Sequence, residues 1–207
     1  MTRGRSSYHH EIAATKRESM LVAATHLFLE NGYDRTSLAS IAQLAGVSRA
    51  TLFKQFPTKA ELFEATVLAA GRSQNSEPVD VQVDDFSAGL LTLGRAYAEL
   101  LNRPEMAALM RTVIAESPRF PELRERTFDF GTLPVIAALG RYLRDAHAAG
   151  IADIDDPGMA SAQFLGMIAS SILWPRLMHG TWSITDDEQE LVIAGAVQTI
   201  AARYATS

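Results

Sequence analysis

A short segment, residues 46–56 with the sequence GVSRATLFKQF, carries hydroxyl and cationic side chains in a pattern suited to binding an anion. Its donors are two hydroxyls, a guanidinium and an ammonium, and no Asp or Glu occurs in residues 35–60. Because phosphates repel carboxylates, an acid-free segment of this kind is suited to lie against a polyanion. Gly46 is expected to stop one helix and Ser48 to cap the next, so that two short helices meet at a sharp turn.

Helical signals surround this segment and predict the elements that must position it. Thr15 and Glu18 form a capping box, in which each side chain satisfies a free backbone N–H, and Gly32 supplies a C-terminal stop. A second capping box, Thr58 with Glu61, follows the segment. The helices predicted from these signals span about 15–31, 37–45, 49–55 and 59–72.

The second and third of these helices have the shape of a helix-turn-helix. Val47 between them is expected to fill the core, and Leu52 and Phe53 are predicted to point inward from the third helix. The start of that helix then projects small side chains and Arg49 outward. A helix of this kind fits the major groove of DNA, which is about 12 Å wide.

The distribution of charge agrees with a polyanion-binding N-terminal part. The whole chain of 207 residues has a formal net charge of -5. Residues 1–72 nevertheless hold nine Lys/Arg against six Asp/Glu, whereas residues 73–207 hold ten against eighteen. A basic head on an acidic remainder predicts different partners for the two parts.

The remainder of the chain is also predicted to be helical, which places the protein in the all-α class with about nine helices. Residues 1–11 are expected to form a flexible basic arm, 12–72 the DNA-binding head with its helix-turn-helix at 37–56, 73–84 a connector, and 85–207 a helical body. The predicted helices of the body span 85–102, 105–116, 121–149 with a kink near Gly131 and Pro134, 157–178 after the cap Asp156, and a last helix to about 205 after a capping box at Thr185.

Several function classes find no support in the residues. The chain has no cysteine, no apolar leader at its N-terminus and no run of about 18 apolar residues, so a cytoplasmic protein without a membrane span is expected. An enzyme on a helical scaffold is an alternative, but no G-x-S-x-G motif or glycine-rich phosphate loop is present. No cofactor or metal is expected, since the Asp153, Asp155 and Asp156 cluster precedes Pro157 and favours helix capping.

A set of residues between 36 and 62 occurs at a characteristic spacing. The set comprises Thr36-Ser37-Leu38, Ile41-Ala42, Ala45-Gly46-Val47-Ser48, Thr51-Leu52-Phe53, Phe56-Pro57, Lys59 and Glu61-Leu62. These residues resemble the DNA-binding domain of TetR-family transcriptional regulators, and the resemblance covers roughly residues 12–72. Further along, residues 110–116 and 118–123 are similar to the AefR-like subgroup of that family.

The resemblance implies roles for individual residues of the head. Thr36 and Ser37, at the start of the second helix, and Lys59, at the start of the fourth, would contact phosphate. Phe53 stands where the family usually has a tyrosine, so a hydroxyl contact with the DNA backbone is expected to be missing, and Lys54 replaces an aromatic residue or histidine. The residues expected at the DNA are Thr36, Ser37, Ser48, Arg49, Ala50, Thr51, Phe53, Lys54 and Lys59.

The resemblance also implies that a small molecule in the body moves the fourth helix and releases a repressor from its operator. A largely apolar effector is expected, with Glu116 as a polar anchor. An alternative is a DNA-binding adaptor that binds another protein and has no small-molecule ligand. The candidate ligand-binding residues are Leu90, Met106, Met110, Glu116, Phe128, Phe164 and Met167.

A homodimer on a palindromic operator is expected, because one short recognition helix makes too few contacts to be specific. Residues 157–178 carry apolar side chains on more than one face, and a second apolar face must be covered by something. This helix and the last one are therefore predicted to pair with their two-fold mates. The predicted interface residues are Ile168, Ile172, Leu191, Ala194, Val197, Ile200 and Ala201.

Overall fold

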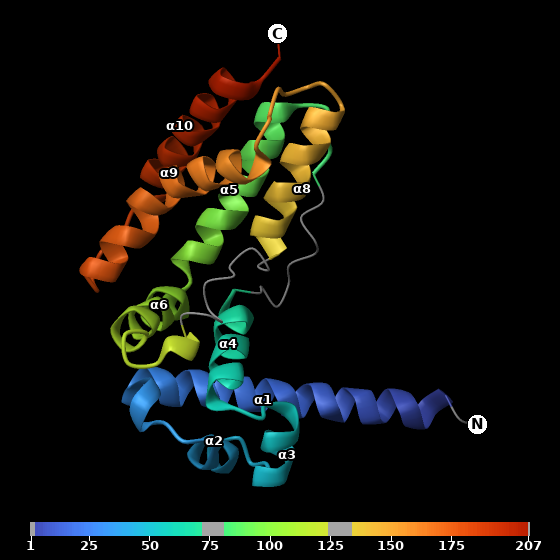
Figure 1. Cartoon of the computed structure of the whole chain (residues 1–207), viewed down its shortest axis with the longest axis vertical. Helices are drawn as coiled ribbons and strands as arrows, with labels where there is room; N and C mark the ends of the chain where they lie inside the picture. The colour runs from blue at the N-terminus through green and yellow to red at the C-terminus, as the bar shows by residue number, and fades with distance from the viewer. Residues whose placement is uncertain (1–2, 72–80, 124–133, 207) are drawn as a thin grey trace. The chain divides into compact units, whose positions relative to one another are not determined.

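The computed structural model describes residues 3–71, 81–123 and 134–206, with side-chain surroundings from residue 13 onward. Within these residues the chain is helical and contains no strand; a single antiparallel bridge joins Ala152 to Ala205. The predicted all-α class is confirmed. The described helices, labelled in Figure 1, are α1 (Arg3–Arg35), α2 (Leu38–Leu44), α3 (Arg49–Gln55), α4 (Lys59–Ala70), α5 (Phe86–Asn102), α6 (Pro104–Glu116), α8 (Pro134–Ala148), α9 (Pro157–Met178) and α10 (Asp186–Tyr204).

The chain divides into two compact units. The first, called the head here, contains the described residues 3–70 and 108–123, and the second, called the body, contains 81–107 and 134–206. Most of α6 and the residues after it therefore belong to the head. The predicted boundary at residue 72 left out this second segment of the head.

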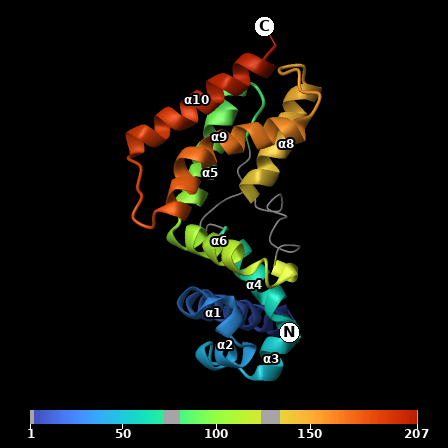
Figure 2. The same ribbon diagram turned by 60° about the vertical axis from the view of Figure 1, so that its left-hand side comes forward.

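In the head, α1 packs against α2 and α4, and α2 packs against α3 (Figures 1 and 2). The predicted turn is present, since Gly46 has a φ of +66°, a conformation that costs little only for glycine. The Ser37 hydroxyl accepts a hydrogen bond from the Ser40 N–H at 3.0 Å, and the Ser48 hydroxyl accepts one from the Thr51 N–H at 3.1 Å. The predicted N-cap at Ser48 is therefore confirmed, and Ser37 caps α2 in the same way.

The start of α1 differs from the prediction. The helix begins at Arg3 and runs without interruption past Thr15 and Glu18, which lie inside it. In a helix interior the carbonyl four residues back already accepts each backbone N–H, so no cap is needed there. The stop at Gly32 is confirmed as a break in the helical conformation, with φ +78° and ψ 171°.

An aromatic cluster forms much of the core of the head. The Phe28 and Phe63 rings meet edge to face with centroids 4.9 Å apart, and Tyr33 lies 5.4 Å from Phe63. A fourth ring, Phe120, comes from the segment after α6 and lies 5.0 Å from Tyr33. Edge-to-face aromatic pairs stabilise a fold beyond the burial of their apolar area. This cluster therefore stabilises the packing of residues 108–123 against α1 and α4.

The body is built on α5, which packs against α8, α9 and α10 (Figures 1 and 2). Close approach of these helices depends on Gly94 in α5. A Cβ at this position would lie 2.8 Å from the Ile193 Cγ2 atom and 3.1 Å from the Phe164 Cζ atom. At the start of α5, the Tyr142 hydroxyl contacts the carbonyl oxygens of Asp85 and Phe86, each at 3.0 Å, and burial raises the pKa of Tyr142 to about 12.

Two helix starts in the body follow the predicted caps. The Asp156 carboxylate accepts the Met159 N–H at 2.9 Å, and Thr185 and Glu188 form the predicted capping box. Pro134 is the first described residue of α8, so the kink predicted near it within a longer helix stays a prediction. Gly131 lies outside the described residues. None of the described helices has the length and hydropathy needed to cross a membrane.

Candidate nucleic-acid interface

Helix α3 presents one face to its surroundings and buries the other. Leu52 and Phe56, four residues apart, are 0% and 3% exposed and anchor the helix in the head. The exposed positions include Arg49, Ala50 and Lys54. Gln55, which the sequence prediction omitted, is exposed as well. Its position next to Lys54 on the same seven-residue helix is the sequence feature that could have identified it as a candidate.

The predicted inward position of Phe53 is wrong. Its side chain is 47% exposed, whereas the neighbouring Leu52 is fully buried. Successive residues of an α-helix are about 100° apart, so Phe53 lies beside the buried stripe of Leu52 and Phe56 and not within it. An aromatic side chain therefore stands on the outer face of α3.

The start of α2 contains one exposed and one buried hydroxyl. Ser37 is exposed at the N-cap. Thr36 is 3% exposed, and its hydroxyl donates to the Gly32 carbonyl at 2.8 Å and the Leu27 carbonyl at 3.0 Å. The Thr36 hydroxyl proton points into the head and satisfies the end of α1, whereas the contact of Thr36 with phosphate stays a prediction.

Lys59 is also directed into the head. Its ammonium donates to three backbone carbonyls, those of Tyr33 at 2.8 Å, Thr36 at 3.1 Å and Asp34 at 3.2 Å. It also lies 4.3 Å from the centroid of the Tyr33 ring. An ammonium has three protons, so these carbonyls take all of them. In this conformation Lys59 holds the α1–α2 turn against the start of α4, and its contact with phosphate stays a prediction.

The electrostatic surroundings of Lys59 agree with this structural role. Burial lowers the pKa of Lys59 from its ordinary value, and the carboxylates of Asp34, Glu116 and Glu122 oppose that shift. Desolvation disfavours the charged form of a lysine. The three carbonyls replace the water that the ammonium has lost, which allows it to remain inside the head.

We expect Lys59→Met to destabilise the head by about 2 kcal/mol, because three charge-assisted hydrogen bonds are lost while the apolar stem is kept. Chemical unfolding followed by circular dichroism measures this change. Lys54→Met is the matched control: Lys54 is exposed, so its replacement should leave the free energy of unfolding unchanged. Equal stability of the two variants would contradict the structural role of Lys59.

The segment after α6 contacts the same turn. Arg119 forms an ion pair with Asp34, with 3.2 Å between Nη2 and Oδ2. Glu116 approaches Gly32, where an added Cβ would lie 3.4 Å from its carboxylate oxygen. The α1–α2 turn, which precedes the helix-turn-helix, is thus held by residues far along the chain. No local sequence signal indicated this arrangement.

The candidate ligand-binding residues do not form one described site. Met110 and Glu116 belong to the head, whereas Leu90, Met106, Phe164 and Met167 belong to the body. Leu90 and Phe164 are fully buried, and Phe164 fills the space beside Gly94. Phe128 lies outside the described residues. The largely apolar effector site with Glu116 as its polar anchor stays a prediction, since its candidate residues are divided between the two units.

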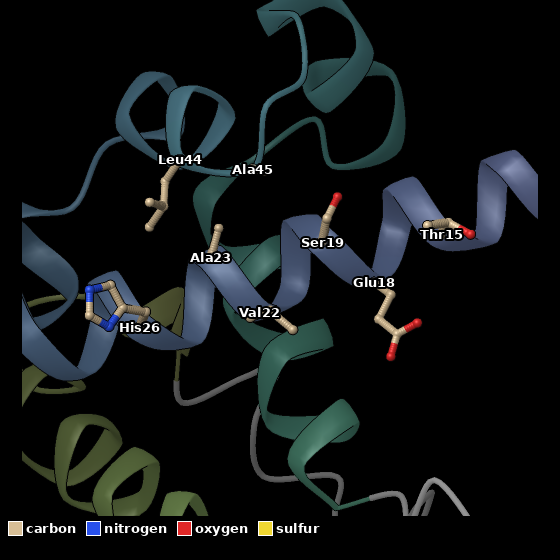
Figure 3. A pocket seen from close by; sticks show the side chains of 8 residues that line it. All are labelled: Thr15, Glu18, Ser19, Val22, Ala23, His26, Leu44 and Ala45. Carbon is tan, nitrogen blue, oxygen red and sulfur yellow. The ribbon is translucent and has the colours of Figure 1, made fainter.

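Two open hollows occur on the head. One has a volume of about 310 Å³ and is lined by Leu29, Gly32, Ala108, Arg111, Thr112, Ala115 and the predicted polar anchor Glu116. The other, of about 640 Å³, lies between α1 and the end of α2 and is lined by the eight residues labelled in Figure 3, where Leu44 points toward α1. Its Val22 and Leu44 side chains are 64% and 53% exposed. Effector sites bury most of their ligand, so a hollow this open does not suit that role.

Four of the predicted interface residues lie inside the body. Ile168 and Ile172 of α9 are 0% exposed, and Val197 and Ile200 of α10 are 7% and 2% exposed. They cannot be presented to a partner without opening the protomer, so their assignment to an interface is wrong. Ala194 and Ala201 are half-buried, and Leu191 is 73% exposed.

The exposed sides of α9 and α10 carry other apolar and small residues, called here the α9–α10 face. Gly166 and Gly195 have open space where a Cβ would be. The small residues of α9 recur at every fourth position, a signal that was available in the sequence. Besides Leu191, the face comprises Met159, Ala162, Gly166, Ser170, Trp174 and Met178 of α9, and Gly195 and Ala202 of α10.

Comparison with known families matches both parts of the chain. The family described as "Bacterial regulatory proteins, tetR family" matches residues 20–66. The family described as "AefR-like transcriptional repressor, C-terminal domain" matches residues 88–206, more than half of the chain. The first match lies within the head, and the second covers most of the body together with residues 108–123 of the head.

Individual proteins agree with these families. The chain is 29% identical to the DNA-binding transcriptional repressor TetR of Mycobacteroides abscessus, over 80% of this chain and 84% of that protein. The structure of a flavonoid-responsive regulator, FrrA, is 31% identical, with a TM-score of 0.74 and coverage of 92% of this chain and 97% of that one. A TetR-family regulator from Pseudomonas syringae is 27% identical, with a TM-score of 0.70 and coverage of 93% and 97%.

Proposed function

Since the chain belongs to the TetR family of transcriptional regulators, and is thus a DNA-binding regulator and not an enzyme, we propose that it represses transcription as a dimer on a palindromic operator. The observation that carries this proposal is the exposed face of α3. It presents Arg49 and Lys54 within an acid-free run, residues 35–60. Phosphates would attract this face and repel the acidic remainder of the chain.

In the proposed complex α3 lies in the major groove. Ala50 has a small exposed side chain, which permits the helix axis to approach the base edges. Arg49, at the first position of α3, can donate two hydrogen bonds to a guanine. Lys54, at the opposite end, and Ser37, at the start of α2, would meet phosphates on either side of the groove.

The proposed dimer forms through the α9–α10 face. Residues 191–202 contain no charged side chain, and neither do the exposed positions of α9 between Met159 and Met178. Two copies related by a two-fold axis would cover these apolar sides with each other. Gly166 and Gly195 permit close approach of the helices. Two heads then bind two half-sites, which supplies the contacts that one short α3 lacks.

A small aromatic effector is proposed to release the operator. Support comes from the regulator FrrA, whose structure this chain resembles over almost its whole length and which is described as flavonoid-responsive. Titration of the DNA-bound protein with a flavonoid, followed by fluorescence anisotropy of labelled DNA, tests this part. Release of the DNA by the flavonoid but not by phenol, a one-ring control, is expected. Failure of a broad panel of flavonoids and other aromatic compounds to release DNA would favour the adaptor alternative.

Selection of bound sequences from a random double-stranded DNA library tests operator binding. The expected product is an inverted repeat whose half-site centres are separated by a whole number of turns of the duplex, one or more. Recovery of no preferred sequence by the full-length protein would overturn the proposed function.

Arg49→Ala is expected to weaken binding to the selected operator by about 10- to 100-fold per half-site, since a bidentate contact with a base is worth about 1–3 kcal/mol. Arg141→Ala provides the control, because it removes the same charge from an exposed position on α8. Anisotropy titrations at one fixed salt concentration compare the two variants. If both lost affinity equally, the net charge of the protein, and not α3, would account for binding.

A further inference from the structure

Phe53 is the most exposed of the described phenylalanine and tyrosine rings of the head, where Phe120 is half-buried. Among the described side chains of the head, the rings of Phe28, Tyr33, Phe56 and Phe63 are all buried. Phe53 is 47% exposed on α3. Leaving an aromatic ring in water forgoes the free energy of its burial. The exposed ring thus requires an explanation that the packing of the head does not supply.

The position of Phe53 places it on the proposed DNA-facing side. It lies three and four residues after Ala50 and Arg49, and residues at these spacings share one side of a helix. The buried side is taken by Leu52 and Phe56. When α3 enters the groove with Arg49 toward the bases, the Phe53 ring enters with it.

Chemistry decides what such a ring can contact there. A phenylalanine ring has no hydrogen-bonding atom, so it cannot satisfy a phosphate or the polar edge of a base. The thymine C5-methyl group is the apolar group that base edges present in the major groove. We propose that Phe53 determines specificity by contacting the methyl group of a thymine in each half-site. This proposal rests on the proposed binding of DNA by α3.

Helix geometry limits where this thymine lies. Four residues of α-helix rise about 6 Å, and successive base pairs are separated by about 3.4 Å. For a helix lying along the groove, the thymine is therefore within about two base pairs of the base contacted by Arg49. The contact also excludes cytosine at this position, because cytosine presents an amino group and no methyl group there.

Deoxyuridine substitution provides the test, since it removes only the methyl group. Each thymine of the selected operator is replaced in turn, symmetrically in both half-sites, and affinity is measured for the unaltered protein, Phe53→Ala and Phe53→Leu. At one thymine the unaltered protein should lose about fourfold in affinity per half-site, the equivalent of one buried methyl group. Phe53→Ala should bind the unmodified operator more weakly and show no further loss at that thymine.

Phe53→Leu keeps an apolar side chain and should retain part of the sensitivity to that methyl group. Circular dichroism checks that each variant is folded. Both variants should fold, because residue 53 is exposed. If the losses caused by Phe53→Ala and by deoxyuridine simply added at every thymine, the proposal would be overturned. This outcome includes the case in which Phe53→Ala weakens binding because a contact with deoxyribose is lost. That result would leave operator binding and the effect of Arg49→Ala intact, so failure of this inference is distinguishable from failure of the proposed function.

Discussion

Gly195→Glu is expected to convert the protein from dimers into monomers and to lower its affinity for the palindromic operator by about 10³-fold. Gly195 lies on the exposed side of α10 with open space around its Cβ position, so the protomer accommodates a larger side chain. In the proposed dimer the same position meets the partner copy. There the new carboxylate would lose its water without gaining a partner.

The effect on the protomer itself should be small or favourable. Glycine in a helix interior costs about 1 kcal/mol relative to a good helix former, and glutamate is one of these. The loss of DNA affinity would therefore come from loss of the second head and not from unfolding. Sedimentation velocity measures the oligomeric state, and anisotropy measures the affinity of the same sample.

Two further variants sharpen this experiment. Gly166→Glu alters the α9 side of the same face, where a Cβ also meets open space, and should act in the same way. Gly140→Glu makes an identical change in α8, outside the α9–α10 face, and should remain dimeric. Intact dimers of both Gly195→Glu and Gly166→Glu would show that the copies associate through another surface.

Ile168→Glu is expected to unfold the body. Ile168 is 0% exposed, and its Cδ1 atom lies 3.4 Å from the Cβ position of Gly94, where α5 and α9 meet closely. A carboxylate there would be buried without a partner, at a cost of about 4 kcal/mol or more including lost packing. This is a large share of the total stability of a typical domain, about 5–15 kcal/mol.

Thermal and urea unfolding, followed by circular dichroism, measure this loss. Ile114→Glu provides the matched control, because it makes the same chemical change at a side chain that is 56% exposed on α6. The control should unfold at nearly the unaltered midpoint. If Ile168→Glu also retained a cooperative transition at that midpoint, Ile168 would not belong to the protomer core, and its predicted place in an interface would be restored.

Most helices of this protein could be predicted from the sequence because their limits depend on local chemistry. The hydroxyls of Ser37 and Ser48 satisfy N–H groups only three residues away, and the same holds for Asp156 and Thr185. Gly46 adopts a backbone conformation that other residues avoid. Such interactions form within one turn of chain. The resemblance of residues 36–62 to the TetR family rested on the same short spacings.

The sequence did not indicate which way several side chains of the head point. Lys59 and Thr36 were assigned to phosphate, yet both donate to carbonyls at the end of α1. The Lys59 contacts join residues more than twenty positions apart, and Phe120 joins the same cluster from after α6. A capping rule cannot detect a cap that arrives from another helix. Only tertiary packing brings these groups together.

Helix α9 shows the same limit most plainly. Its sequence correctly predicted that apolar and small side chains occupy more than one side. Ile168 and Gly166 are two residues apart, which places them about 200° apart around the helix. Periodicity therefore separates the two sides, but both are uncharged, so it cannot say which one meets α5. The packing of α5 against α9 made that choice, burying Ile168 and leaving Gly166 exposed.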